Sequence, residues 1–117
     1  MLPIKRRIKK QSFQEIMKEG VFLHSPSFYI RFLSKTPAEP SNFGFVVPNK
    51  VIKTSVGRHL IKRKLTAAVK GLLQSIKPGF QAIVFLKKDI RNLTFLEIKT
   101  EMVDLFKKGK MLNESKT

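Results

Sequence analysis

The sequence predicts an α+β fold, a two-layer sandwich in which a small mixed β-sheet of about four strands packs against helices. Segments with alternating or continuous apolar residues, typical of strands, alternate with segments whose apolar residues recur at helical spacing. A helical segment separates the last two strands, which indicates a βαβ unit with helices on one face of the sheet. The 117 residues suffice for a single domain with one core, so residues 1–117 are expected to form one domain. The expected order is α-β-β-β-α-β-α.

The first helix is expected within SFQEIMKEG, where Ser12 and Glu15 have the spacing of a capping box. Phe13, Ile16 and Met17 share one face of this helix, and Gly20 ends it. Residues 1–10 come before the helix and are expected to form a basic arm. The basic residues singled out in this arm are Arg6, Arg7, Lys9 and Lys10, with Lys5 beside them.

Four segments are expected to form strands. The first is short, around residues 21–24, and the second is SFYIRFL, residues 27–33, whose side chains alternate between two faces. The third, FGFVVPNK, covers residues 43–50, and Pro48 must lie at its end or at a sheet edge because proline has no amide hydrogen. The fourth, FQAIVFL, covers residues 80–86, and its nearly continuous apolar run is typical of a strand buried on both faces.

The longest helix is expected to begin after Thr54 or Ser55, either of which can serve as its N-cap, and to end at KPGF, residues 77–80. Its apolar face carries Ile61, Leu65, Ala68, Val69, Leu72 and Ile76, and its opposite face carries His59, Arg63, Thr66 and Lys70, flanked by Lys62 and Lys64. In the last helix, Thr94 and Glu97 again have capping-box spacing. The residues expected to face the core there are Phe95, Ile98, Met102 and Leu105. Residues 109–117 are expected to be a disordered tail.

The charge of the chain is strongly one-sided, with 24 Lys and Arg against 8 Asp and Glu and a net charge of +16. Residues 40–88 contain ten basic residues and no acidic ones. Such an excess repels itself and opposes compaction, so it indicates a polyanionic partner. Nucleic acid is the first expectation and an anionic membrane the second.

Other features narrow the class of protein. The chain has no cysteine, which excludes disulfides and thiolate metal sites. No apolar run reaches the ~18 residues that a membrane span needs, and no apolar segment follows the basic N-terminus as it does in a secretory signal. We therefore expect a soluble, cytoplasmic protein.

Histidine chemistry is the main enzymatic alternative. His24 and His59 are the only histidines, and neither lies in a cluster of cysteines or carboxylates that would complete a metal site. Two-metal nuclease chemistry needs grouped carboxylates, and the acids here are scattered. His59 alone can still serve as a general base, so a protein-only nuclease remains an alternative.

The stretch VGRHLIKRKL, residues 56–65, favours phosphate binding. Arg58, Lys62 and Arg63 lie near the start of the long helix, where side-chain charge adds to free backbone amides. A solvated amphipathic face is the alternative, although such faces usually contain acids for i,i+4 pairs and this one has none. Tyr29 and Arg31, on the outward face of the second strand, can stack or pair with single-stranded bases, or belong to an ordinary half-exposed strand.

The order of these motifs resembles the protein subunit of bacterial ribonuclease P over residues 7–108. RIKKQSF, residues 7–13, resembles the family's opening helix, and GFVVPNK, residues 44–50, resembles its strand ending in lysine. RHLIKRKL, residues 58–65, fits the family's cluster of Arg, Asn and Lys residues that opens the long helix. In that cluster Arg58, Lys62 and Arg63 match, His59 replaces the asparagine, and Leu60 replaces the second arginine.

The resemblance implies a left-handed βαβ crossover, whereas physical rules alone predict a right-handed one. It also implies that the catalyst is an RNA, that no catalytic residue and no metal site lies in the protein, and that Mg²⁺ is held with the RNA. The expected partners are the catalytic RNA of ribonuclease P and precursor tRNA, with no membrane partner and no small-molecule substrate. The residues expected to contact the catalytic RNA are Lys50, Lys53, Arg58, His59, Lys62 and Arg63. Those expected to line a cleft for the 5′ leader are Phe13, Met17, Tyr29 and Arg31, with Met17 and Arg31 at positions where the family usually has aromatics. A small basic ribosomal protein that binds rRNA is the alternative that composition leaves open.

Overall fold

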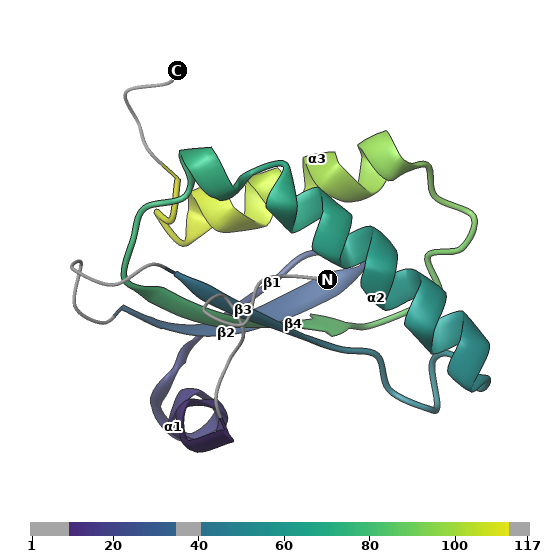
Figure 1. The fold of residues 1–117 in the computed structure, drawn as a ribbon, viewed down its shortest axis with the longest axis horizontal. Helices are drawn as coiled ribbons and strands as arrows, with labels where there is room; N and C mark the ends of the chain where they lie inside the picture. Colours follow the sequence, from purple (N-terminus) through teal and green to yellow (C-terminus); the bar gives the residue numbers. More distant parts are fainter. Residues whose placement is uncertain (1–9, 35–40, 113–117) are drawn as a thin grey trace.

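The computed structural model of the protein describes residues 10–34 and 41–112. The helices and strands occur in the predicted order α-β-β-β-α-β-α (Figure 1). They are α1 (Lys10–Glu19), β1 (Val21–His24), β2 (Phe28–Ser34), β3 (Asn42–Val46), α2 (Ser55–Lys70), a short 3₁₀ helix η2 (Leu73–Ser75), β4 (Phe80–Leu86) and α3 (Phe95–Lys108). The predicted α+β class and the four-stranded mixed sheet are confirmed.

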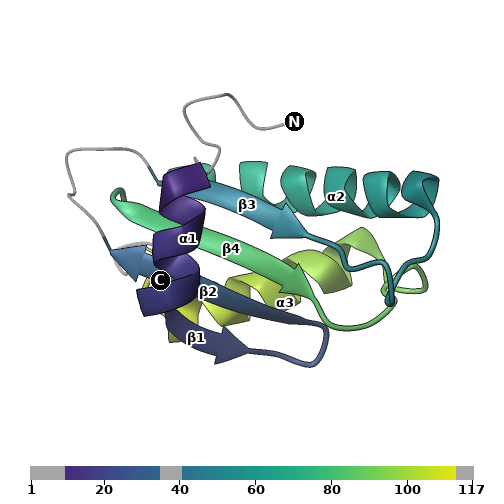
Figure 2. The same cartoon turned by 90° about the horizontal axis from the view of Figure 1, so that it is seen from below.

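The sheet has the strand order β1-β2-β4-β3. The pairs β1–β2 and β2–β4 are antiparallel, and β3–β4 is parallel. Helix α2 makes the connection between the two parallel strands. Seen from the side of α1 (Figure 2), both strands point the same way and α2 returns behind the sheet, which makes the crossover left-handed. This is the handedness that the family resemblance implies and that the general preference opposes.

Helices lie on both faces of the sheet, which corrects the expectation that they all lie on one. Helices α2 and α3 cover one face, and α1 crosses the other (Figures 1 and 2). The main core fills the space on the side of α2 and α3 and includes Phe28, Val84 and Phe106. A smaller apolar cluster of Ile16, Ile83 and Phe85 lies on the side of α1. Strand β4 is therefore buried on both faces, as its continuous apolar run predicts.

Several predicted boundaries and orientations are wrong. Helix α1 begins at Lys10, so Ser12 lies inside the helix and not at the N-cap position predicted for it. Helix α2 ends at Lys70, well before KPGF, although Leu72 and Ile76 beyond its end are buried as expected. Thr66 was assigned to the solvent face of α2 but is buried, because α2 packs against α3 as well as the sheet. Phe95 was assigned to the core but is 47% exposed in the first turn of α3.

The predicted disordered tail is wrong for residues 109–112. Met111 is fully buried, and its carbonyl oxygen accepts a hydrogen bond from the Lys77 backbone nitrogen at 2.7 Å. Leu112 forms an antiparallel bridge with Ile76. The end of α3 is thus fastened to the segment that leads into β4. Residues 113–117 lie outside the described residues.

The capping box predicted for α3 is confirmed. Thr94 Oγ1 accepts a hydrogen bond from the Glu97 backbone nitrogen at 3.1 Å, and Glu97 Oε1 accepts one from the Thr94 backbone nitrogen at 2.8 Å. Glu101, one turn further along α3, accepts a hydrogen bond from the Ser27 backbone nitrogen at 2.6 Å. The β1–β2 turn is thereby tied to α3, which fixes the position of the edge strand β1.

Candidate nucleic-acid interface

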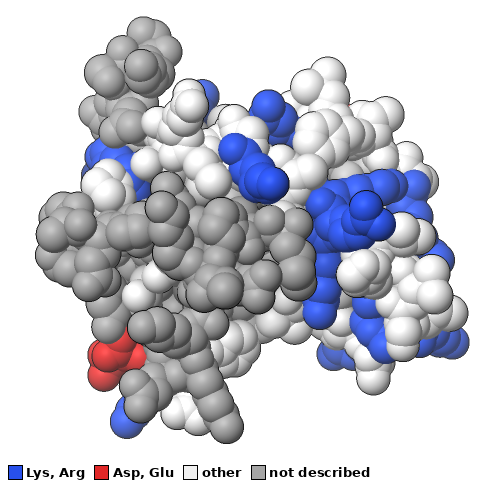
Figure 3. Space-filling model, viewed as in Figure 1, with Lys and Arg blue, Asp and Glu red and all other residues white. Residues whose placement is uncertain are grey.

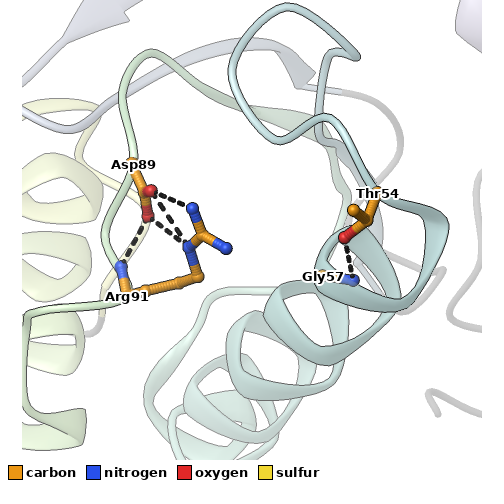
Figure 4. Close-up of polar contacts among 4 residues, drawn as sticks. All are labelled: Thr54, Gly57, Asp89 and Arg91. Atoms are coloured by element: carbon orange, nitrogen blue, oxygen red, sulfur yellow. Dashed lines mark hydrogen bonds and ion pairs between the residues drawn. The ribbon is translucent and has the colours of Figure 1, made fainter.

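Thr54 sets the start of α2. Its backbone is extended, and its side-chain oxygen accepts a hydrogen bond from the Gly57 backbone nitrogen at 3.0 Å (Figure 4). A Cβ atom at Gly57 would lie 2.8 Å from side-chain atoms of both Ile52 and Thr54, so only glycine fits in this close approach. Of the two predicted N-caps, Thr54 is therefore the one that the structure uses.

The predicted contacts for a catalytic RNA come together around the start of α2. Lys50 and Lys53 are exposed in the loop after β3, and His59, Lys62 and Arg63 are exposed on the helix. The first turn of α2 contains no acidic residue. In Figure 3, Lys and Arg side chains gather over this part of the surface. We call the set Lys50, Lys53, Arg58, His59, Lys62 and Arg63 the basic face.

Arg58 differs from the rest of the basic face because it is half-buried and bound to the backbone. Its Nη1 atom donates hydrogen bonds to the carbonyl oxygens of Ile52 and Lys53, both at 3.0 Å. Its Nη2 atom donates to the Ser55 hydroxyl at 3.2 Å. These three bonds hold the loop of residues 52–55 against the first turn of α2. Arg58 therefore positions the basic face as well as adding charge to it.

Arg91 is a cation near this surface that sequence reasoning missed. It lies in the loop between β4 and α3, and its Nη1 atom is 3.9 Å from where a Cβ atom of Gly57 would be. Arg91 Nε donates to both carboxylate oxygens of Asp89 at 3.0 Å, and its backbone nitrogen donates to Asp89 Oδ1 at 2.9 Å (Figure 4). The Asp89–Arg91 pair is far from the start of α2 in sequence. Its D-x-R spacing shows that the two side chains can pair, but not that Arg91 lies beside α2.

The Asp89–Arg91 pair shifts the pKa of both of its members. The side-chain hydrogen bonds from Arg91 are the main cause that lowers the pKa of Asp89 below its ordinary value of 3.8. The same bonds to Asp89 raise the pKa of Arg91. Both groups are exposed to solvent, so the pair orients the guanidinium and adds little to the stability of the fold.

The four residues predicted to line a leader cleft lie together on the side of the sheet that α1 covers. Phe13, Met17 and Tyr29 are half-buried and pack against the cluster of Ile16, Ile83 and Phe85. Arg31 is half-buried, and its Nη1 atom donates a hydrogen bond to the Met17 carbonyl oxygen at 3.2 Å. We call Phe13, Met17, Tyr29 and Arg31 the leader face. All four keep some exposed surface, as contact with a ligand requires.

Aromatic contacts continue this face across the sheet. The Tyr29 ring stacks on Phe85, with 4.5 Å between ring centroids and 7° between ring planes. Arg31 Cζ lies 5.3 Å from the centroid of the Phe22 ring on β1, within the range of a cation–π contact. Phe22 was not among the predicted site residues. In the β1–β2 register it pairs with Arg31 and so faces the same side of the sheet, a relationship that the sequence of the short strand does not reveal by itself.

The two histidines do not meet. His24 is at the end of β1, where its ring centroid is 6.0 Å from that of Phe22, and His59 is on α2, across the sheet. Among residues 10–34 and 41–112, no three His, Asp or Glu side chains group as metal ligands would. No helix in the described part of the chain is long and apolar enough to cross a membrane. The predicted contacts in the basic arm, namely Arg6, Arg7, Lys9 and the side chain of Lys10, lie outside the described residues.

The fold, the acid-free basic face and the half-exposed aromatic face define a small basic RNA-binding protein of the α+β class. The family model of ribonuclease P matches residues 2–110, so the chain belongs to the ribonuclease P family. The resemblance stated from the sequence is thus confirmed. The chain is a subunit of an endoribonuclease of tRNA 5′ processing, and the ribosomal-protein alternative is not favoured.

Relatives and solved structures agree with this family. The chain is 30% identical over 95 residues to the ribonuclease P protein component of Picosynechococcus sp., covering 80% of this chain and 81% of the relative. It is 29% identical over 111 residues to that of Listeria innocua, covering 94% and 92%. The structure of the RNase P protein of Staphylococcus aureus superposes with a TM-score of 0.80 at 25% sequence identity, covering 92% of this chain and 98% of that one.

Proposed function

We propose that the protein assists the catalytic RNA of ribonuclease P in removing the 5′ leader from precursor tRNA. The observation that carries this proposal is the separation of two surfaces by one sheet. The basic face is on α2 and the loop before it, and the leader face is on the side of the sheet covered by α1. A protein with this arrangement can hold one RNA by its phosphates while a second, single-stranded segment contacts the opposite face of the sheet.

The basic face is suited to the backbone of a folded RNA. Lys62 and Arg63 are exposed side chains on α2, and exposed Lys53 lies just before the first turn of this helix, where the positive end of its dipole is. Contacts to phosphate fix position and orientation without reading sequence. We therefore assign the catalytic RNA to the basic face, where affinity matters more than sequence discrimination.

The leader face is suited to an unpaired strand. Tyr29 presents part of an aromatic ring, and Phe13 and Met17 add apolar surface beside it. Base–aromatic stacking contributes about 1–3 kcal/mol per base and tolerates any sequence. Arg31 supplies a fixed cation next to these groups. This combination favours precursor tRNA, which has a 5′ leader, over mature tRNA, which has none.

The proposal places the catalytic groups on the RNA. We expect magnesium ions to be held mainly by RNA phosphates, and the protein to raise affinity and orient the substrate. A cytoplasmic location is part of the same proposal. His59 then contacts RNA on the basic face and is not a general base.

Reconstitution tests the proposed function. The purified chain is combined with the ribonuclease P RNA of a related bacterium and a precursor tRNA labelled at its 5′ end. We expect release of the intact leader at low magnesium only when RNA and protein are both present. Protein that fails to stimulate the RNA, or that copurifies with ribosomal subunits in place of this RNA, would contradict the proposal.

A further inference from the structure

Phe22 belongs to a row of rings that crosses three neighbouring strands. The centroids of Phe22 on β1 and Tyr29 on β2 are 5.2 Å apart, and those of Tyr29 and Phe85 on β4 are 4.5 Å apart. The exposure of these rings increases toward the edge of the sheet. Phe85 is 6% exposed, Tyr29 is half-buried, and Phe22 is 47% exposed. The row therefore begins under α1 and ends in solvent on the edge strand.

An exposed phenylalanine on an edge strand is a hazard, because such edges can pair with other chains. A single exposed apolar residue needs no functional explanation. Phe22 differs from such an isolated residue, because its ring contacts Tyr29 of the leader face and lies beneath the guanidinium of Arg31. In the antiparallel register Phe22 pairs directly with Arg31, and Arg31 Cζ lies 5.3 Å from the centroid of its ring.

A hydrogen bond to α1 also holds the Arg31 side chain in place. Its Nη1 atom donates to the carbonyl oxygen of Met17 in α1, so the guanidinium cannot leave the ring without breaking that bond. β1 itself is held through the β1–β2 turn, where Glu101 of α3 accepts a hydrogen bond from Ser27. The ring and the cation are thus set before any ligand arrives, and preorganisation of this kind reduces the entropy lost on binding.

We propose that Phe22 extends the leader face onto β1 and stacks with a base of a single-stranded RNA segment that runs from α1 toward the sheet edge. This inference rests on the proposed function and adds a residue to its substrate contacts. Arg31 lies over one side of the ring, so the base stacks on the exposed side. The net charge of +16 and the fixed Arg31 cation complement the phosphates of such a strand better than they complement an apolar protein segment.

Phe95 offers a matched control. It is also a phenylalanine, it is also 47% exposed, and it is the first residue of α3, a helix on the opposite side of the sheet from α1. The variants Phe22→Leu and Phe95→Leu remove the same aromatic ring from equally exposed positions. Both keep an apolar side chain, so differences in fold stability stay small and are checked by urea unfolding.

The experiment uses the reconstituted holoenzyme with precursor tRNA and with mature tRNA. We expect Phe22→Leu to weaken binding of the precursor by roughly five- to 150-fold, the range for losing one base stack, and to leave mature tRNA unchanged. Phe95→Leu is expected to leave both affinities unchanged. Phe22→Trp keeps a stacking surface and is expected to bind the precursor like the unsubstituted protein.

A second readout locates the stacked base. Precursors with 2-aminopurine at successive leader positions are bound to the holoenzyme, and one position is expected to show fluorescence that changes when Phe22 is replaced by leucine but not when Phe95 is. Equal precursor affinity for Phe22→Leu and the unsubstituted protein overturns the inference while the proposed function stands. Equal losses for precursor and mature tRNA overturn it as well. If the unsubstituted protein forms no holoenzyme with the catalytic RNA, both the proposed function and this inference are overturned. The two failures are therefore distinguishable.

Discussion

The guanidinium of Arg58 donates a hydrogen bond to the carbonyl oxygen of Ile52, with 3.0 Å between Nη1 and the oxygen. Ile52 is almost completely buried, and the same Nη1 atom also binds the carbonyl oxygen of Lys53. A residue chosen from the sequence as a phosphate contact therefore also ties α2 to the loop before it. The contribution of the Arg58 charge to RNA binding can be separated from the contribution of Arg58 to folding by comparison with Lys62, which is exposed on the same helix.

Replacing Arg58 is expected to affect folding as well as binding. Arg58→Ala should lower the free energy of unfolding by about 1–3 kcal/mol, because two backbone carbonyl groups lose a charged partner. Lys62→Ala should change it by less than ~0.5 kcal/mol, as exposed surface substitutions do. Urea unfolding of the two variants measures this difference. Equal stabilities would show that solvent replaces the Arg58 hydrogen bonds without cost.

Lys62 is expected to contribute one phosphate contact to RNA binding. Its removal in Lys62→Ala should reduce the slope of log affinity against log salt by roughly 0.7–0.9, the value for one neutralised phosphate. Lys107, an exposed lysine in the last turn of α3, provides the control, and Lys107→Ala should leave the slope unchanged. The measurement is a titration of catalytic RNA at four or more salt concentrations. An unaltered slope in Lys62→Ala would remove α2 from the RNA interface.

Tyr29 is expected to discriminate between precursor and mature tRNA. Tyr29→Ala should weaken precursor binding by about 1–3 kcal/mol through the loss of base stacking, with little effect on mature tRNA. The variant also loses the ring contact with Phe85, so some stability is lost too. Any loss of folded protein affects both substrates equally, and the ratio of the two affinities isolates the contact with the leader. An unchanged ratio would exclude Tyr29 from the leader face.

The Asp89–Arg91 pair gives a prediction for pH. Because hydrogen bonds from Arg91 lower the pKa of Asp89 in the folded protein, the stability that this pair supplies is present above the unfolded pKa. It is lost as the pH falls through the lowered folded value, below 3.8, so the pair stays ionised at neutral pH. Titration of the Asp89 carboxyl by NMR should show the lowered pKa, and Arg91→Ala should return it toward 3.8. A carboxyl that titrates identically in both proteins would contradict the pairing.

Local patterns predicted the elements that depend on nearby residues. The capping box of Thr94 and Glu97 and the doubly buried strand FQAIVFL are confirmed, because each depends on spacing within a few residues. Tyr29 and Arg31 lie on the outward face of β2, as their alternation with core residues predicts, and the family resemblance grouped them with Phe13 and Met17, which pack on the same side of the sheet. Its role in binding the leader stays a prediction.

Relationships between distant segments were not predictable in the same way. Arg91 reaches the start of α2 only because the β4–α3 loop folds beside Gly57, and no pattern in either segment records this. Met111 is buried because residues 111–112 pair with the segment before β4, although three lysines, at positions 107, 108 and 110, come directly before it. The left-handed crossover came from the resemblance to a family, against the usual preference. Each of these features depends on contacts between segments that are far apart in the sequence, and a local pattern does not record such contacts.

His59 is the residue at which the binding and catalytic interpretations differ most. It is exposed on the basic face, between Arg58 and Leu60, and the cluster it occupies has an asparagine in the family pattern. An imidazole, like a carboxamide, can donate and accept a hydrogen bond, so His59→Asn keeps the polar contact with RNA. The variant should retain holoenzyme activity to within about twofold, whereas loss of a general base would reduce it by roughly 10²–10⁴-fold. The protein without RNA should not cleave precursor tRNA. Cleavage by RNA-free protein that disappears in His59→Asn would identify VGRHLIKRKL as an active site and overturn the RNA-binding assignment of the basic face.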